Sequence, residues 1–78
     1  MKVQLRPWKP NPARAKGILR GVHVTGEFAD TQFAGEVQSI RSSGRAAIVR
    51  LTQTAGENAV WRPGEEVWLP IACLTTAE

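Results

Sequence analysis

The chain has few of the residues that build disulfides, metal sites and catalytic centres. Its 78 residues include one cysteine, one histidine and no tyrosine. Cys73 has no partner for an internal disulfide, which fits a reducing compartment, and with His23 alone it cannot complete a metal cluster. We therefore expect a cytoplasmic protein that holds no metal or other cofactor.

Long apolar runs are missing as well. Near the N-terminus, Val3 and Leu5 are too few, and Pro7, Pro10 and Pro12 too close together, for a signal peptide or a membrane span. We expect no membrane partner. Hydrophobic residues make up 42% of the chain, so it has enough of them for one folded domain near the lower size limit.

A convergent set of catalytic side chains is also lacking. Glu65 and Glu66 are neighbours on an expected strand, so they point to opposite faces and cannot act as a pair. Ser42 and Ser43 have no evident base and are typical turn formers. No glycine-rich phosphate loop or metal-ligand spacing is present. We expect a binding module and not an enzyme, although self-association could assemble a site from several copies.

Acidic residues are missing from the first third of the chain. Residues 1–26 hold six cations and no acid, whereas residues 27–78 hold four arginines and seven acids, so the two parts carry +6 and −3. A basic arm on a mildly acidic body favours an anionic partner. The alternative is a solvated tail that keeps a small protein in solution.

The arm is expected to span residues 1–16. Its three prolines lie within six residues, which disfavours a helix and favours extended, polyproline-like backbone. Trp8 lies among them and either packs the arm onto the body or stacks on a base or partner surface. We find no amphipathic helix elsewhere in the sequence.

Residues 33–52 predict a central hairpin. Ala47, Val49 and Leu51 alternate, which places them on one face of a strand. Gly44 ends the polar turn before them and can adopt the positive φ that tight hairpins need. Val37 and Ile40 differ in parity in the first strand, so we expect a bulge near residues 38–39 if both side chains point inward.

Further short strands are expected around this hairpin. They are residues 17–25, 59–62 and 65–69, with a loop over residues 26–34, a turn at Pro63-Gly64 and a short apolar turn over residues 71–74. Five short strands in so small a chain favour a closed sheet. We expect an all-β, five-stranded SH3-like barrel over residues 17–78, with an OB-like barrel as the alternative.

Two short motifs resemble known SH3-like proteins. The first resembles the ferredoxin-docking subunit S of photosynthetic NADH-dehydrogenase-like complexes, and that resemblance implies a basic surface that receives an acidic protein. It consists of Asp30-Thr31, Phe33, Gly35, Val37-Gln38, Gly44 and Ala46-Ala47.

The second motif, Val67 to Leu74, is similar to the end of type II dihydrofolate reductases. In that family a Val-Gln-Ile-Tyr run before the proline lines the active pore of a tetramer. Here Glu66 to Leu69 precede Pro70, so the glutamine and the tyrosine are absent. The resemblance implies the fold, with an oligomeric reductase as the third functional alternative.

The candidate site combines the arm with the outward face of the barrel. Cationic heads beside an indole suit single-stranded nucleic acid or RNA, and they also suit an acidic protein. No motif with a defined base code is present. The candidate residues are Lys2, Arg6, Trp8, Lys9, Arg14, Lys16, Arg20, Arg41, Arg45, Arg50, Arg62 and Trp68.

Overall fold

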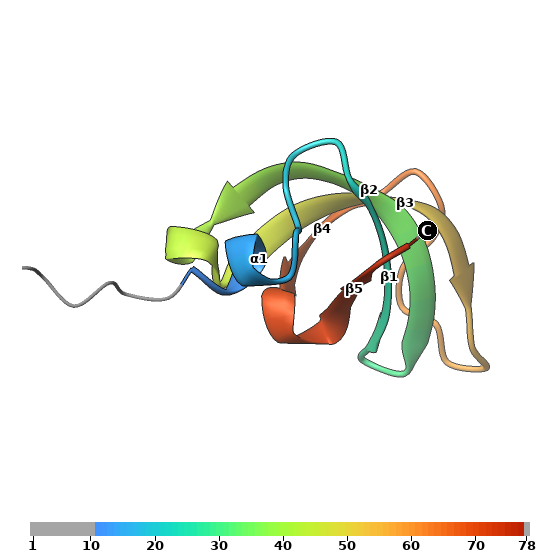
Figure 1. The fold of residues 1–78 in the computed structure, drawn as a ribbon. Coiled ribbons are helices and arrows are strands. Elements are labelled where there is room, and N and C mark those ends of the chain that lie inside the picture. The colour runs from blue at the N-terminus through green and yellow to red at the C-terminus, as the bar shows by residue number, and fades with distance from the viewer. Residues whose placement is uncertain (1–10, 78) are drawn as a thin grey trace, which may run out of the picture.

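The computed structural model describes residues 11–77, and this part of the chain is mostly β-structure. Five strands form one antiparallel sheet in the order β4-β3-β2-β1-β5 (Figure 1). None of the helices within residues 11–77 is long and apolar enough to cross a membrane. The strands are β1 (His23–Phe28), β2 (Thr31–Arg41), β3 (Ala46–Ala55), β4 (Glu66–Pro70) and β5 (Leu74–Thr76). The other elements are α1 (Pro12–Ala15), η1 (Ser42–Gly44) and η2 (Ile71–Cys73), the last two being 3₁₀ turns.

The predicted central hairpin is confirmed. β2 and β3 pair along their whole length, from Gln32 opposite Ala55 to Arg41 opposite Ala46, and η1 joins them. Ala47, Val49 and Leu51 are all buried, as their alternation predicts.

The predicted bulge is confirmed as well. The register passes from Val37 opposite Val49 to Ser39 opposite Ile48, which leaves Gln38 without a partner. A second shift lies between Ala34 and Gly35. Bulges bend and twist a strand, and the long β2 curves strongly in Figure 1. The curvature allows β2 to pair with β1 on one side and with β3 on the other.

Several strand boundaries differ from the predicted ones. The strand expected over residues 17–25 begins only at His23, and the segment expected as a strand at residues 59–62 belongs to the loop between β3 and β4. The strand that was not predicted is β5, which pairs with β1. A strand of three residues is too short to show an alternating pattern in the sequence, so β5 is recognised only by its pairing with β1.

The loop expected over residues 26–34 is a tight two-residue turn. Ala29 and Asp30 have φ of 52° and 60°, so both lie in the left-handed region, as a type I′ hairpin turn requires. That turn usually carries Asn-Gly or Asp-Gly, so the sequence Ala-Asp did not predict it. The hairpin therefore forms at a cost in backbone strain that the strands on either side must offset.

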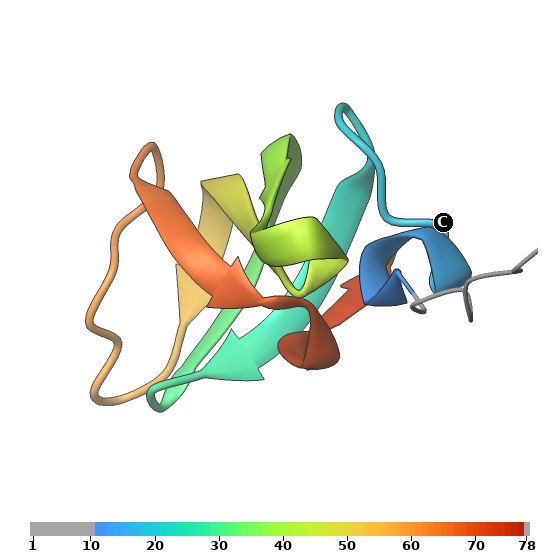
Figure 2. The same ribbon diagram turned by 90° about the vertical axis from the view of Figure 1, so that its left-hand side faces the viewer.

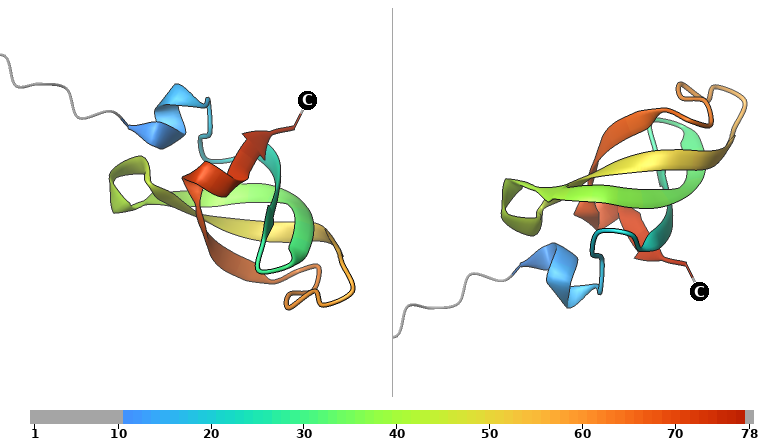
Figure 3. Two further views of the ribbon diagram at one scale, coloured as in Figure 1. Left: turned by 90° about the horizontal axis from the view of Figure 1, so that it is seen from below. Right: turned by 90° about the horizontal axis from the view of Figure 1, so that it is seen from above.

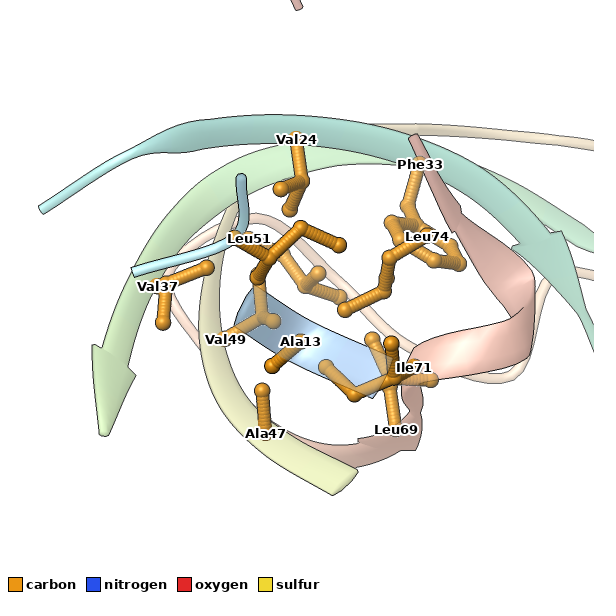
Figure 4. Close-up of a cluster of buried hydrophobic side chains, with 11 residues drawn as sticks. Ala13, Val24, Phe33, Val37, Ala47, Val49, Leu51, Leu69, Ile71 and Leu74 are labelled. Atoms are coloured by element: carbon orange, nitrogen blue, oxygen red, sulfur yellow. The ribbon is translucent and has the colours of Figure 1, made fainter. Parts of the chain in front are cut away.

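The core lies between the inner face of the curved sheet and the segment that precedes it (Figure 4). Ala13 of α1 and Ile18 after it are buried with the apolar side chains of the strands. The buried members from the sheet and η2 are Val24, Phe33, Val37, Ala47, Val49, Leu51, Leu69, Ile71 and Leu74. The N-terminal segment from residue 11 thus forms part of the folded unit.

The expectation of extended backbone throughout residues 1–16 is wrong for α1. The Asn11 side chain accepts a hydrogen bond from the Arg14 backbone N–H at 3.1 Å, and Pro12 occupies the first turn. Proline is well suited to that position, because the N–H it lacks would have no partner there. The Asn-Pro pair was therefore a helix-start signal, although the prolines as a group favoured an extended arm.

Candidate anionic-partner interface

The acids and most of the cations occupy separate stretches of the described chain, and Arg62 is the exception. The acids of residues 11–77 all lie in residues 27–36 and 57–66, and they are Glu27, Asp30, Glu36, Glu57, Glu65 and Glu66. The stretches 11–26 and 37–56 contain cations and no acid. The fold decides whether those two basic stretches meet.

They do meet, at the end of the molecule where α1, η1 and η2 lie together (Figure 2). The Ile71 backbone N–H donates to the Arg45 carbonyl at 2.8 Å, which ties η2 to the residue after η1. Gly44 has φ of 89°, and a Cβ there would lie 1.8 Å from Asn11 Oδ1, so only glycine fits beneath the cap of α1. We call this region the basic end. Its exposed cations are Arg14 on α1 and Arg41 and Arg45 on either side of η1, and the exposed Arg20 follows α1 in the loop before β1.

Lys16 belongs to the same end but has a structural role. Its ammonium donates hydrogen bonds to the carbonyls of Ile71 and Leu74, both at 3.1 Å, and of Ala72 at 3.4 Å. A lysine ammonium has three N–H donors, so all of them are occupied. Lys16 therefore holds η2 against the end of α1, and its contact with a partner stays a prediction.

Arg50 and Arg62 do not join the basic end. On the outer face of the sheet Arg50 lies in register between Glu36 and Glu66, and its Nη2 is 3.2 Å from Glu66 Oε2. Arg62 lies in the loop before β4, where its backbone N–H donates to the Glu65 carboxylate. The expected single outward face of arginines is thus divided, because both residues lie beside acids.

The two tryptophans of the described chain have different environments. Trp68 of β4 is 58% exposed and pairs in register with Ile48 of β3. Trp61 is half-buried, stacks on Phe28 with ring centroids 6.1 Å apart, and meets Phe33 edge-on at 6.4 Å. Trp68 therefore remains available to a partner, whereas Trp61 covers the core.

The loop that carries Trp61 lies at the end of the sheet opposite α1 (Figure 3). Thr31 is buried, and its Oγ1 donates to the Ala29 carbonyl at 3.2 Å while accepting from the Val60 backbone N–H at 2.9 Å. This one hydroxyl fastens the β3–β4 loop to the turn between β1 and β2. Sequence reasoning missed it, since nothing in the sequence marks a threonine after a turn as buried.

Lys2, Arg6, Trp8 and Lys9 lie outside the described residues. Within residues 11–77, no three side chains among His, Cys, Asp and Glu come close enough together to hold a metal ion. Comparisons with protein-family models, with curated proteins and with solved structures find no match for this chain. The candidate interface thus rests on the arrangement of its own residues.

Proposed function

We propose that the chain is a non-catalytic binding module whose basic end contacts an anionic polymer, with single-stranded nucleic acid as the partner. The observation that carries the proposal is that Arg14 lies on α1 and that Arg41 and Arg45 flank η1, two elements that pack together, while Arg20 follows α1 in the loop before β1. All four are exposed, and none makes an ion pair with another residue of 11–77. Unpaired surface cations of this kind bind phosphates and release counterions, which is the main source of affinity for nucleic acids.

Trp68 supports the same partner. Its side chain is exposed on the outer face of β4, and the end of β4 leads directly into η2 at the basic end. An exposed indole on the strand that leads into the basic end offers a surface on which an unpaired base can stack. An acidic protein would use the arginines but would gain less from the indole.

The proposal includes the finer aspects of fold and location. We propose an SH3-like barrel, because five antiparallel strands in one sheet, with two register shifts in β2, suit a small sheet that curls toward closure. The cations Lys2, Arg6 and Lys9 are proposed to extend the binding surface, and the single cysteine supports a cytoplasmic setting.

The test compares two double variants of equal charge. Arg41→Gln/Arg45→Gln removes two cations of the basic end, and Arg50→Gln/Arg62→Gln removes two cations that lie beside acids. Fluorescence anisotropy with labelled octauridylate is measured over a salt series. For the first variant, the slope of log K against log salt should become shallower by about 1.4, because each phosphate contact contributes about 0.7 on single strands. The second variant should keep the wild-type slope.

Equal losses in both variants would mean that net charge alone acts, and the assignment to the basic end would then be wrong. No detectable binding to octauridylate at low salt would refute the nucleic-acid proposal. Retention of an acidic protein that excess octauridylate cannot displace would point instead to a docking subunit.

A further inference from the structure

A hollow of about 360 Å³ lies at the basic end, between segments that are far apart in the sequence. Its walls come from α1, from the residue after η1, from the end of β4 and from η2. The lining residues are Pro12, Lys16, Arg45, Pro70, Ile71 and Ala72. We call it the Arg45 hollow. Its volume is that of a small ligand site.

Hydrogen bonds hold these walls in place. The Ile71 N–H donates to the Arg45 carbonyl at 2.8 Å, and the Lys16 ammonium donates to the Ile71 carbonyl at 3.1 Å. Ile71 is buried, so its side chain also anchors η2 to the core. The hollow is therefore preformed, and a ligand would not have to order its walls.

The lining has a simple chemical character. Pro12, Pro70, Ile71 and Ala72 contribute apolar surface, and Lys16 has no N–H left to donate. Arg45 is exposed and makes no ion pair within the described residues. A ligand that matches this lining has a small, weakly polar body with a negative group directly beside it.

A nucleotide has this form. We infer that the Arg45 hollow receives one unpaired base of a single-stranded nucleic acid, with the Arg45 guanidinium on an adjacent phosphate. Trp68 lies two residues before Pro70 on β4, and alternate residues of a strand share a face, so a neighbouring base can stack on its indole. This inference rests on the proposed function and adds the base as the recognised group.

The experiment separates base from phosphate. The full chain is titrated against octauridylate and against an abasic octamer that has the same number of phosphates and no bases. Octauridylate should bind roughly tenfold more tightly, the size of effect seen when a base stacks in a protein site. Ala72→Leu, which fills the hollow, should bring the affinity for octauridylate down toward that for the abasic octamer. Its affinity for the abasic octamer should stay unchanged.

Ala59→Leu is the matched control, because Ala59 is an exposed alanine in the loop at the opposite end. It should keep the full difference between the two octamers. Amide NMR supplies a readout that needs no variant: the Ile71 and Ala72 signals should shift with octauridylate and hardly at all with the abasic octamer.

The proposed function and the base-recognition inference would fail with different experimental results. Equal, salt-dependent binding of both octamers would overturn base recognition and leave the phosphate contacts of the basic end intact. Tighter binding of octauridylate with unmoved Ile71 and Ala72 signals would place the base elsewhere, and the hollow would be the wrong site. Binding of neither octamer would remove both proposals.

Discussion

The two ends of the curved sheet are closed by different means. At the basic end, α1 buries Ala13 and the Lys16 ammonium holds three carbonyls at and beside η2. At the opposite end, the β3–β4 loop lays Trp61 over Phe33, and the Thr31 hydroxyl holds the loop by its Val60 N–H. The basic end is therefore held by apolar burial and a lysine ammonium, and the opposite end by aromatic packing and a buried hydroxyl.

The difference bears on function. The Lys16 ammonium is bonded to η2 at the basic end, whereas the guanidinium groups of Arg14, Arg20, Arg41 and Arg45 make no ion pair within residues 11–77. On the sheet face, by contrast, the Arg50 guanidinium pairs with the Glu66 carboxylate. Surface cations that stabilise nothing locally are the ones a partner can neutralise at little cost to the fold.

The largest expected effect tests whether α1 belongs to the core. Ala13→Asp puts a charge where the native side chain is 1% exposed, and it should lower the free energy of unfolding by on the order of 4 kcal/mol. Urea denaturation followed by circular dichroism measures it. The control Ala15→Asp lies on the exposed side of the same helix. It should cost less than about 1 kcal/mol. Equal stability of the two variants would show that α1 does not close this end.

A smaller effect is expected at the opposite end. Thr31→Val keeps the shape of the side chain but removes both hydrogen bonds of the buried hydroxyl and leaves the Val60 N–H without its acceptor. The free energy of unfolding should fall by about 1–3 kcal/mol. Thr25→Val, at an exposed position of β1, is the matched control and should change stability little. Hydrogen exchange at Val60 should rise in the Thr31 variant alone. Unchanged exchange there would contradict the fastening role of Thr31.

The smallest effect concerns the clamp of the basic end. Lys16→Met keeps the length of the side chain and removes its hydrogen bonds to η2, so stability should fall by about 1 kcal/mol. Arg14→Met removes the same charge from the exposed face of α1 and should cost less than about 0.5 kcal/mol. Equal stability of Lys16→Met and Arg14→Met would contradict the role of Lys16 as a clamp.

Much of the central hairpin could be predicted from local pattern. The alternation of Ala47, Val49 and Leu51, the glycine in the turn and the unequal parity of Val37 and Ile40 each report on a few neighbouring residues. A strand that is buried on one face must alternate apolar and polar residues whatever lies around it. The sequence was therefore sufficient to predict the hairpin and its bulge. The exposure of Trp68 opposite the buried Leu69 follows from the same rule.

The remaining elements depend on contacts between distant residues. β5 is a strand because β1 pairs with it, and Ala29 and Asp30 adopt left-handed backbone because the strands around them demand a two-residue turn. Likewise, Lys16 and Arg45 look alike in the sequence as surface cations. Their roles differ only because η2 packs against α1, which brings three carbonyls to the Lys16 ammonium.

By itself, the sequence determined that this is a small β-rich chain with most of its cations and acids in separate stretches, since composition and alternation are local properties. The tertiary structure decided which cations meet. It brought the 11–26 and 37–56 stretches together at one end and set Arg50 beside acids, because strand register and the packing of α1 on η1 and η2 fix those neighbours.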